Sequence, residues 1–225
     1  MNTLIFTIVT LCAVGIVAAI ILYFVSQKFK VEEDPRIDDV EKMLPGANCG
    51  GCGFPGCRGL ACALVEQEDI SSLYCSVGGA DCMKAVADYL GKVAPVKEAQ
   101  VATVRCGGTC EKRPRTSTYA GTKSCAIASG VYVGETNCAY GCLGLGDCYK
   151  ACQFDAITMD EATGTPKVDE EKCVGCGACV KACPKIVIEL RKKAPKGRKI
   201  YVSCVNKDKG AVARKACKVA CIGCG

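Results

Sequence analysis

The strongest constraint on this chain is the run Cys173–Pro184, CVGCGACVKACP, in which four cysteines are separated by two, two and three residues and a proline follows. This spacing is typical of [4Fe-4S] ligation, and the fourth cysteine of such a run reaches the other cluster of a pair. The proline ends any helix that would otherwise cross the turn. The run therefore predicts iron-sulfur chemistry.

The amino-acid composition supports the same chemistry. The chain has 225 residues with 22 cysteines, no histidine and no tryptophan. Such an excess of cysteine indicates either a disulfide scaffold or a metalloprotein. The absence of histidine excludes histidine-dependent catalytic triads, histidine-ligated haem and Rieske centres. Small cysteine-rich blocks usually need a metal or a disulfide to stay folded.

An uncharged run, Leu4–Val25, predicts a membrane anchor over residues 1–27. As a helix it is roughly 33 Å long, enough to cross a bilayer. It lacks the amphipathic period of a buried soluble helix, and Cys12 within it is interpreted as a small apolar residue. No basic residue precedes the run, which argues against a secretory signal, whereas Lys28 and Lys30 follow it. We therefore expect a single-pass protein of the inner (cytoplasmic) membrane with its bulk in the cytoplasm, where disulfides are disfavoured.

The rest of the chain divides into cysteine-rich segments of an α+β protein. We expect a four-cysteine iron-sulfur domain over 28–90, a linker over 91–104 and a bacterial-type 2[4Fe-4S] ferredoxin-like domain over 105–192. Residues 193–225 are expected to form a basic loop and the start of a further cysteine-rich repeat that stops in mid-motif. Apolar patterns predict helices over 58–67 and 80–90 and short strands over 154–159 and 186–190. The acidic segment 31–42 is either a tether or a surface helix.

The ferredoxin-like domain is predicted to hold two clusters. Cys173, Cys176 and Cys179 would share one cluster with Cys152, and Cys183 would reach the other. The ligands predicted for that other cluster are Cys138, Cys142, Cys148 and Cys183. Here the pattern departs from the simple rule, because Leu145 occupies the expected middle position and Gln153 replaces the proline. Cys138 is the nearest substitute for the missing cysteine.

A separate block, Cys49-x2-Cys52-x4-Cys57 followed by Cys75, predicts a further [4Fe-4S] cluster, the first along the chain. Its glycine-rich loop can wrap closely around an inorganic core and direct N–H groups at the sulfurs. Zinc is the alternative for four cysteines. Cys62 and Cys82 lie in helical stretches and are interpreted as small apolar residues. The chain is thus expected to carry at least three clusters.

Seven further cysteines have two interpretations: ligands of an additional cluster, with one ligand borrowed from elsewhere, or partly idle thiols. They are Cys106, Cys110, Cys125, Cys204, Cys217, Cys221 and Cys224. An internal repeat runs through them. Twelve residues separate Cys125 from Cys138 and three separate Cys138 from Cys142, and the same gaps follow Cys204.

The segment Arg191–Lys199 holds six basic residues in nine. It could steer an acidic partner such as ferredoxin, rest against anionic lipid, or be a solvated loop. Nucleic acid is a poor interpretation, because the basic residues form one short run without interleaved aromatic residues.

The stretch LPGANCGGCGFPGC, with a later YCSVGG and a ferredoxin pair behind a membrane helix, resembles the B subunit of the Rnf complex, the ion-translocating ferredoxin:NAD oxidoreductase. The extra cysteines resemble the longer variants of anaerobes. The resemblance implies an electron-transfer subunit that accepts electrons from soluble ferredoxin inside a membrane complex moving Na+ or H+. It makes the chain part of a translocase, with the other subunits as partners.

No substrate-converting site is expected in the chain itself. The sequence has no G-x-G-x-x-G between a strand and a helix, no evident flavin site, and one predicted membrane helix, which cannot form an ion path. Two rival hypotheses remain: a stand-alone membrane-anchored polyferredoxin serving another reductase, and a non-redox protein in which metal only holds the fold.

Overall fold

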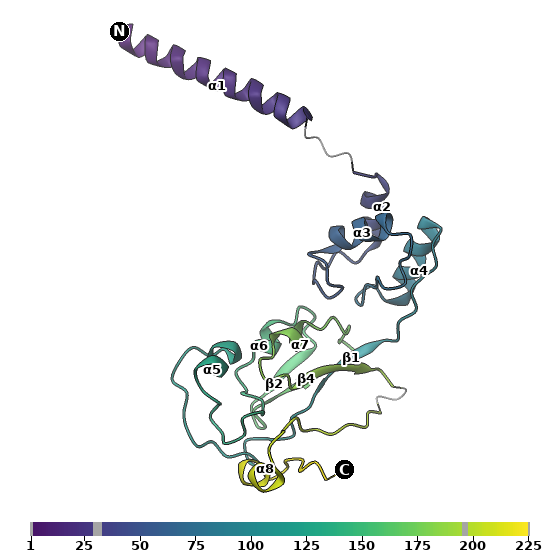
Figure 1. Cartoon of the computed structure of the whole chain (residues 1–225), viewed down its shortest axis with the longest axis vertical. Helices are drawn as coiled ribbons and strands as arrows, with labels where there is room; N and C mark the ends of the chain where they lie inside the picture. Colours follow the sequence, from purple (N-terminus) through teal and green to yellow (C-terminus); the bar gives the residue numbers. More distant parts are fainter. Residues whose placement is uncertain (1, 29–32, 195–197, 225) are drawn as a thin grey trace. The chain divides into compact units, whose positions relative to one another are not determined.

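The computed structural model describes residues 2–28, 33–194 and 198–224. The chain forms two compact units, Met1–Pro35 and Arg36–Gly225 (Figure 1). The first is built around a long helix, and the second contains every cysteine except Cys12. The mixture of helices and short strands confirms the predicted α+β class.

Helix α1 (Asn2–Lys28) confirms the predicted apolar helix. Its side chains from residue 5 to residue 28 are all exposed. The part Ile5–Lys28 is long and apolar enough to cross a membrane, and it is the one such segment in the described residues. A helix that is apolar all round is suited to lipid. Of the two lysines expected beyond the apolar run, Lys28 ends the helix and Lys30 lies outside the described residues.

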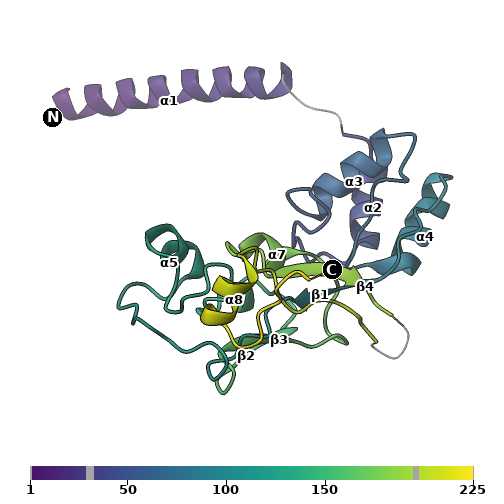
Figure 2. The same ribbon diagram turned by 60° about the horizontal axis from the view of Figure 1, so that its bottom comes forward.

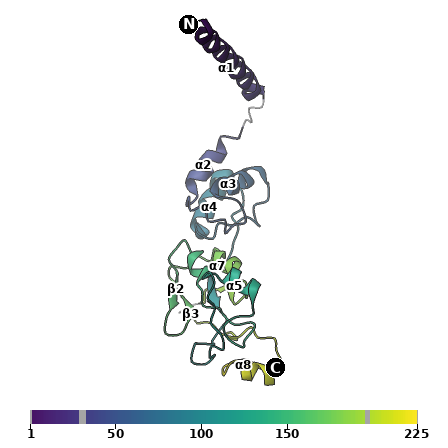
Figure 3. The ribbon, with the colours of Figure 1, turned by 90° about the vertical axis from the view of Figure 1, so that its left-hand side faces the viewer.

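Three helices form the four-cysteine domain: α2 (Arg36–Met43), α3 (Cys57–Glu66) and α4 (Gly79–Leu90) (Figure 3). Their core is made of fully buried side chains, including Val40, Leu60, Leu64, Met83 and Val86. This burial follows the helical period that predicted α3 and α4. The acidic segment is a helix from Arg36 onward, and residues 31 and 32 lie outside the described range.

Helix α2 is attached to α3 by both apolar packing and charge. Arg58 Nη1 lies 2.9 Å from Asp38 Oδ1 and 2.8 Å from Glu41 Oε2. Cys62 and Cys82 are partly buried and pack against the apolar core, as expected for small apolar residues. This domain therefore has a core of its own beside its cysteines.

The ferredoxin-like domain contains two antiparallel strand pairs. Strand β1 (Gln100–Val104) pairs with β4 (Ile188–Lys192), and β2 (Ile157–Asp160) pairs with β3 (Thr165–Val168) in a hairpin (Figure 2). The short helices α6 (Asp147–Lys150) and α7 (Ala178–Ala182) lie side by side, with α6 against β2 and α7 against β4. The two predicted strands are present as β2 and β4, each starting slightly later than expected.

The linker prediction over 91–104 was wrong for its last five residues, which form β1. Val101, Ala102 and Thr103 are buried, and the whole strand is paired with β4. Its partner lies far away in the sequence, so a five-residue run with two valines gave little local signal. The segment before the ferredoxin-like domain is therefore partly an element of that domain.

Two further helices, α5 (Cys125–Val131) and α8 (Gly210–Ala216), lie in the segments with repeated cysteine spacing. The first helix begins at Cys125, whereas the second ends just before Cys217. Equal cysteine spacing thus places the helices differently in the two segments. The repeat is one of sequence spacing and does not extend to the fold.

Candidate iron-sulfur sites

Cys152, Cys173, Cys176 and Cys179, which define the third site, line one cavity. These are the four cysteines that the spacing assigned to one cluster. The remaining wall is largely apolar and includes Ala102, Phe154, Ile157 and Leu190. Four cysteines around a largely apolar cavity fit the ligand set of a [4Fe-4S] core.

The loop of the third site is closed tightly against strand β1. Gly175 has φ +67°, and a Cβ at this position would overlap the carbonyl oxygen of Gln100. Glycine is therefore required on both conformational and steric grounds. The amide of Ala102 donates to Cys173 Sγ at 3.4 Å. Hydrogen bonds to cluster sulfurs are one of the factors that set cluster potential, so β1 contributes to the site.

Burial makes the thiols of this region costly to ionise without a cation. It raises the pKa of Cys179 to about 12, with repulsion from Cys173 and Cys176 adding to the effect. It likewise raises the pKa of Cys142 to about 12 and that of Cys148 to about 11. Such thiols are protonated at neutral pH unless metal replaces the proton, because metals bind the thiolate form.

The second site differs from the prediction in one of the four cysteines that it brings together. Its cavity is lined by Cys125, Cys142, Cys148 and Cys183, and Cys138 is not part of its wall. The predicted grouping of Cys138 with the other three is thus not the arrangement that the structure brings together. Cys125 takes the fourth position instead.

Asp147 explains how Cys125 reaches this site. Its Oδ2 accepts hydrogen bonds from Ser124 Oγ at 2.8 Å and from the Ala126 amide at 3.0 Å. Because Asp147 starts α6, these bonds attach the beginning of α5 to the turn that holds Cys148. No cysteine spacing in the sequence predicts this contact. The residues that make it, Ser124 and Asp147, come together only in the folded chain.

The first site lies at the start of α3. Asn48 adopts φ +46°, and its Oδ1 accepts the Cys57 amide at 2.7 Å, which fixes the glycine-rich loop to the helix. The amide of Gly78 donates to Cys75 Sγ at 3.3 Å. Burial is the main cause of the raised pKa of Cys75, and charges on Cys52 and Cys57 add to it. The fold thus brings these three predicted ligands together.

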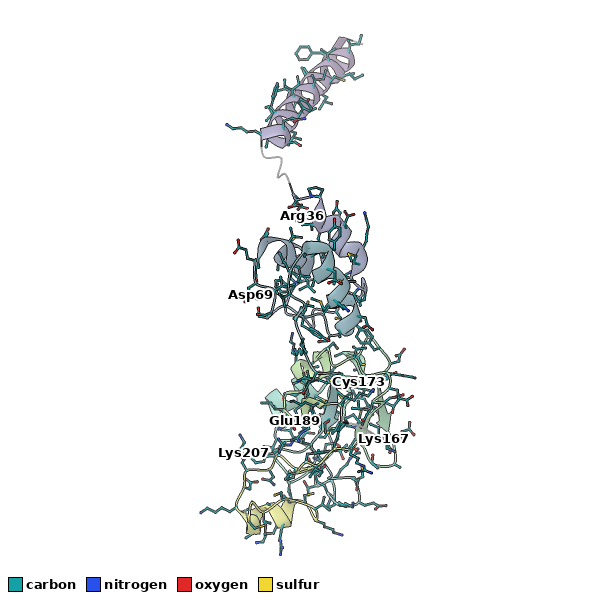
Figure 4. All side chains as sticks on the ribbon, turned by 90° about the vertical axis from the view of Figure 1, so that its right-hand side faces the viewer. Arg36, Asp69, Lys167, Cys173, Glu189 and Lys207 are labelled. Carbon is teal, nitrogen blue, oxygen red and sulfur yellow. The ribbon has the colours of Figure 1, made fainter. Side chains whose placement is uncertain are left out.

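Cys49, the remaining predicted ligand, opens the same loop on the side of the third site. The pKa of Cys176 is raised by burial first, and then by charges on Cys49, Cys152 and Cys173. A Cβ at Gly51 would lie 2.8 Å from the Cys176 carbonyl oxygen. Tyr74, next to Cys75, lines a cavity together with Cys173, which is labelled in Figure 4. The first and third sites are therefore neighbours.

The described residues contain no group of three or more Cys, Asp or Glu side chains arranged around a single metal ion. A structural zinc site needs four ligands within about 2.3 Å of one ion. In the second and third sites, four cysteines instead line one cavity each. Together with the cysteine spacing, this arrangement favours a multi-iron core over one zinc ion.

The other predicted candidates fall into two groups. Cys106, Cys204 and Cys217 line a further cavity together with Cys138. Cys110, Cys221 and Cys224 line neither this cavity nor those of the second and third sites. Cys110 lies at the turn between β2 and β3, where its amide donates to the Thr163 carbonyl at 3.1 Å.

The basic run 191–199 is largely engaged by the protein itself. Arg191 is paired with Glu189, and its guanidinium lies 5.3 Å from the ring centroid of Tyr201. Lys192 Nζ lies 2.5 Å from Glu98 Oε2, and Lys199 Nζ lies 2.7 Å from Glu170 Oε1. Residues 195–197 of the run lie outside the described residues. These pairs favour a structural role over a free docking surface.

Two family models match the cysteine-rich segments. The model described as a 4Fe-4S dicluster domain matches residues 136–187, and a model for an Fe-S cluster domain matches residues 44–72. Together with the cysteine-lined cavities, they establish that the chain carries several [4Fe-4S] clusters.

The chain is also similar over nearly its whole length to curated proteins. It is 44% identical over 221 residues to the B subunit of the Na+-translocating ferredoxin:NAD+ oxidoreductase complex of Acetobacterium woodii, covering 98% of this chain and 65% of that protein. It is 43% identical to the B subunit of the proton-translocating ferredoxin:NAD+ oxidoreductase complex of Clostridium ljungdahlii, covering 98% and 76%. It is 40% identical to the B subunit of the ion-translocating oxidoreductase complex of Methanosarcina acetivorans, covering 99% and 83%.

Proposed function

Because the chain belongs to the family of B subunits of ion-translocating oxidoreductase complexes, we propose that it relays electrons from reduced ferredoxin into a membrane complex. That complex would pass the electrons toward NAD+ and couple their flow to the movement of Na+ or H+. The names of two relatives specify different ions, so the coupling ion is left open.

The contiguity of the cysteine sites carries this proposal. A bound [4Fe-4S] cluster gains or loses one electron, which makes it a carrier rather than a site of substrate conversion. Cys148 and Cys152, at either end of a short turn, belong to the second and third sites. Cys179 and Cys183 connect the same two sites along α7. Two backbone segments therefore hold the second and third sites side by side.

The close approach of Gly51 to Cys176, where an added Cβ would lie 2.8 Å from the Cys176 carbonyl oxygen, extends this series to the first site. The atoms of Cys176 nearest to that position are its carbonyl oxygen, Cβ and Cα, so the spacing between the two loops is set by the fold rather than by the ends of flexible side chains. We infer that electrons pass between the ferredoxin-like domain and the first site here. The first site is also the closest in sequence to α1, which suits delivery to membrane-embedded partners.

In this proposal the chain is anchored in the membrane, and partner subunits bind nicotinamide and form the ion path. Helix α1 would anchor it as a single-pass protein of the cytoplasmic membrane, with Lys28 marking the cytoplasmic end under the positive-inside rule. Nicotinamide binding and the ion path would belong to those partners, and soluble ferredoxin would dock on the ferredoxin-like domain.

Replacing Cys176 with serine in the assembled complex tests the route. We expect ferredoxin-dependent NAD+ reduction by membrane vesicles to fall to the background of vesicles without this chain. The matched control is Cys62→Ser, a partly buried cysteine that packs against the apolar core of the four-cysteine domain. Unchanged electron flow in Cys176→Ser would rule out the route through the third site.

Co-purification separates the proposal from the stand-alone polyferredoxin. An affinity-tagged chain, solubilised in mild detergent, should bring down several multi-span membrane proteins. Recovery of the chain alone, still able to serve a different reductase, would favour the polyferredoxin instead.

A further inference from the structure

A fourth cavity in the ferredoxin-like region is lined by Cys106, Cys138, Cys204 and Cys217. Like the cavities of the second and third sites, it is lined by four cysteines. The four cysteines come from four separate segments of the chain, so no spacing motif predicts that they lie together. Cys138 and Cys217 are buried, and Cys106 and Cys204 are partly buried.

The wall of this cavity carries a buried positive charge. Arg113 is 8% exposed and lines the cavity, and its Nη2 donates to the Cys142 carbonyl at 2.5 Å. Its Nε is buried without a hydrogen-bond partner among the described residues. None of the described residues that line the cavity is an aspartate or a glutamate. A buried cation without a counter-charge is strongly unfavourable, so the site calls for a bound anionic group.

The backbone around Arg113 is shaped to admit its side chain. A Cβ at Gly141 would overlap the Arg113 guanidinium at Nη1. At Gly108, a Cβ would lie 3.3 Å from Cys217 Sγ and 3.4 Å from Arg113 Cδ. Two glycines thus let the arginine and the thiols share one compact wall.

The sulfurs already receive hydrogen bonds of the kind that thiolate ligands accept. The Cys142 amide donates to Cys106 Sγ at 3.4 Å, and Asn206 Nδ2 lies 3.9 Å from Cys138 Sγ. A thiolate accepts such bonds more strongly than a thiol does, because its charge assists the bond. The donors are therefore in place for a ligated, negatively charged set of sulfurs.

We propose that Cys106, Cys138, Cys204 and Cys217 bind a fourth [4Fe-4S] cluster, with Arg113 as its buried counter-charge. Four thiolates around a core of about +2 carry a net charge of about −2, which the guanidinium partly neutralises. Cys138, which the spacing assigned to the second site, lines this fourth cavity, and Cys125 lines the second site in its place. The site itself does not depend on the proposed electron relay, but its place in the relay does.

That place is at the far end of the series of neighbouring sites. Cys138 and Cys142 lie in one turn but serve the fourth and second sites, and the Cys142 amide contacts Cys106. The order of contacts is therefore fourth, second, third and first. In this order the fourth cluster and the first site are the two ends of the series.

Metal content of the full-length chain, purified anaerobically in detergent, tests the site without any measurement of electron flow. We expect about sixteen iron and sixteen sulfide per chain, at about four of each per cluster. Cys204→Ser should lose about four of each. Cys224→Ser is the matched control, since this exposed cysteine lies outside the cavity and should leave the content unchanged.

A double variant separates the two assignments of Cys138. If Cys138 and Cys204 share one cluster, Cys138→Ser, Cys204→Ser and the double variant all lose the same iron. A loss in Cys138→Ser but not in Cys204→Ser would overturn the proposal. A content of about twelve iron in the parent protein would also overturn the proposal. The same holds if the parent contains about twelve iron and one zinc ion, and Cys204→Ser loses the zinc. Any of these results would leave the proposed electron relay through the other three sites untouched.

Discussion

Replacing Asp147 with alanine probes how Cys125 is held at the second site. The variant removes the acceptor of two hydrogen bonds, from Ser124 Oγ at 2.8 Å and the Ala126 amide at 3.0 Å. Each hydrogen bond to a charged group contributes about 1.5–3 kcal/mol. Asp147 is only half-buried, so water will return part of this and we expect a net loss of about 2 kcal/mol. That corresponds to a factor of about 30 in the population with Cys125 in place.

The expected result is a second cluster that loses iron from one corner. Incubation of the full-length chain with an iron chelator should release iron from one cluster about 30-fold faster than in the parent. The EPR signal of a three-iron cluster should appear at the same rate. Asp147→Asn keeps an amide oxygen as acceptor and should restore most of the parent's stability.

Two outcomes would contradict the roles given to Asp147 and Cys125. If Asp147→Ala loses iron at the parent's rate while Cys125→Ser destroys a cluster, Cys125 is a ligand but Asp147 does not position it. If neither variant changes iron release, Cys125 is not a ligand, and the assignment of the second site from its cavity is wrong.

Two further substitutions test the neighbouring contacts. Gly51→Ala would place a Cβ 2.8 Å from the Cys176 carbonyl oxygen and 2.9 Å from its Cβ, so the first and third sites must move apart. We expect unchanged iron but weaker magnetic coupling between reduced clusters by EPR, whereas Gly130→Ala, which meets nothing within 4 Å, should change neither. Lys92 Nζ donates to the carbonyls of Leu64, Val65 and Gln67 at 2.6, 3.0 and 2.7 Å. Lys92→Met should cost about 2 kcal/mol and speed hydrogen exchange at the end of α3 about 30-fold, unlike the exposed Lys84→Met; equal exchange in both would contradict the capping role.

Local patterns predicted the parts of this protein that depend on local geometry. Three cysteines that line the third site lie within one tight loop, so cysteine spacing alone groups Cys173, Cys176 and Cys179. Helix α3 and helix α4 followed from apolar residues at helical spacing, because one face of each must be buried. Along these segments, neighbours in sequence are also neighbours in space.

The errors arose where distant segments meet. Strand β1 was hidden in a predicted linker because its partner is β4, near the other end of the domain. Cys125, rather than Cys138, lines the second site, and the two hydrogen bonds of Asp147 beside it join segments that no cysteine spacing relates. A ligand supplied across a long loop is chosen by such contacts, and the nearest cysteine in sequence need not be the nearest in space.

This exchange has a consequence for the whole series of sites. Within the short segment from Cys138 to Cys152, Cys138 lines the cavity of the fourth site, Cys142 and Cys148 line that of the second, and Cys152 lines that of the third. If Cys138 had stayed with the second site, the fourth would lack a ligand and its contact with the second through this segment. Recruiting Cys125 therefore frees one cysteine to connect a further carrier to the same backbone. Three sites held by one segment keep fixed spacings, which is what a relay of electrons requires.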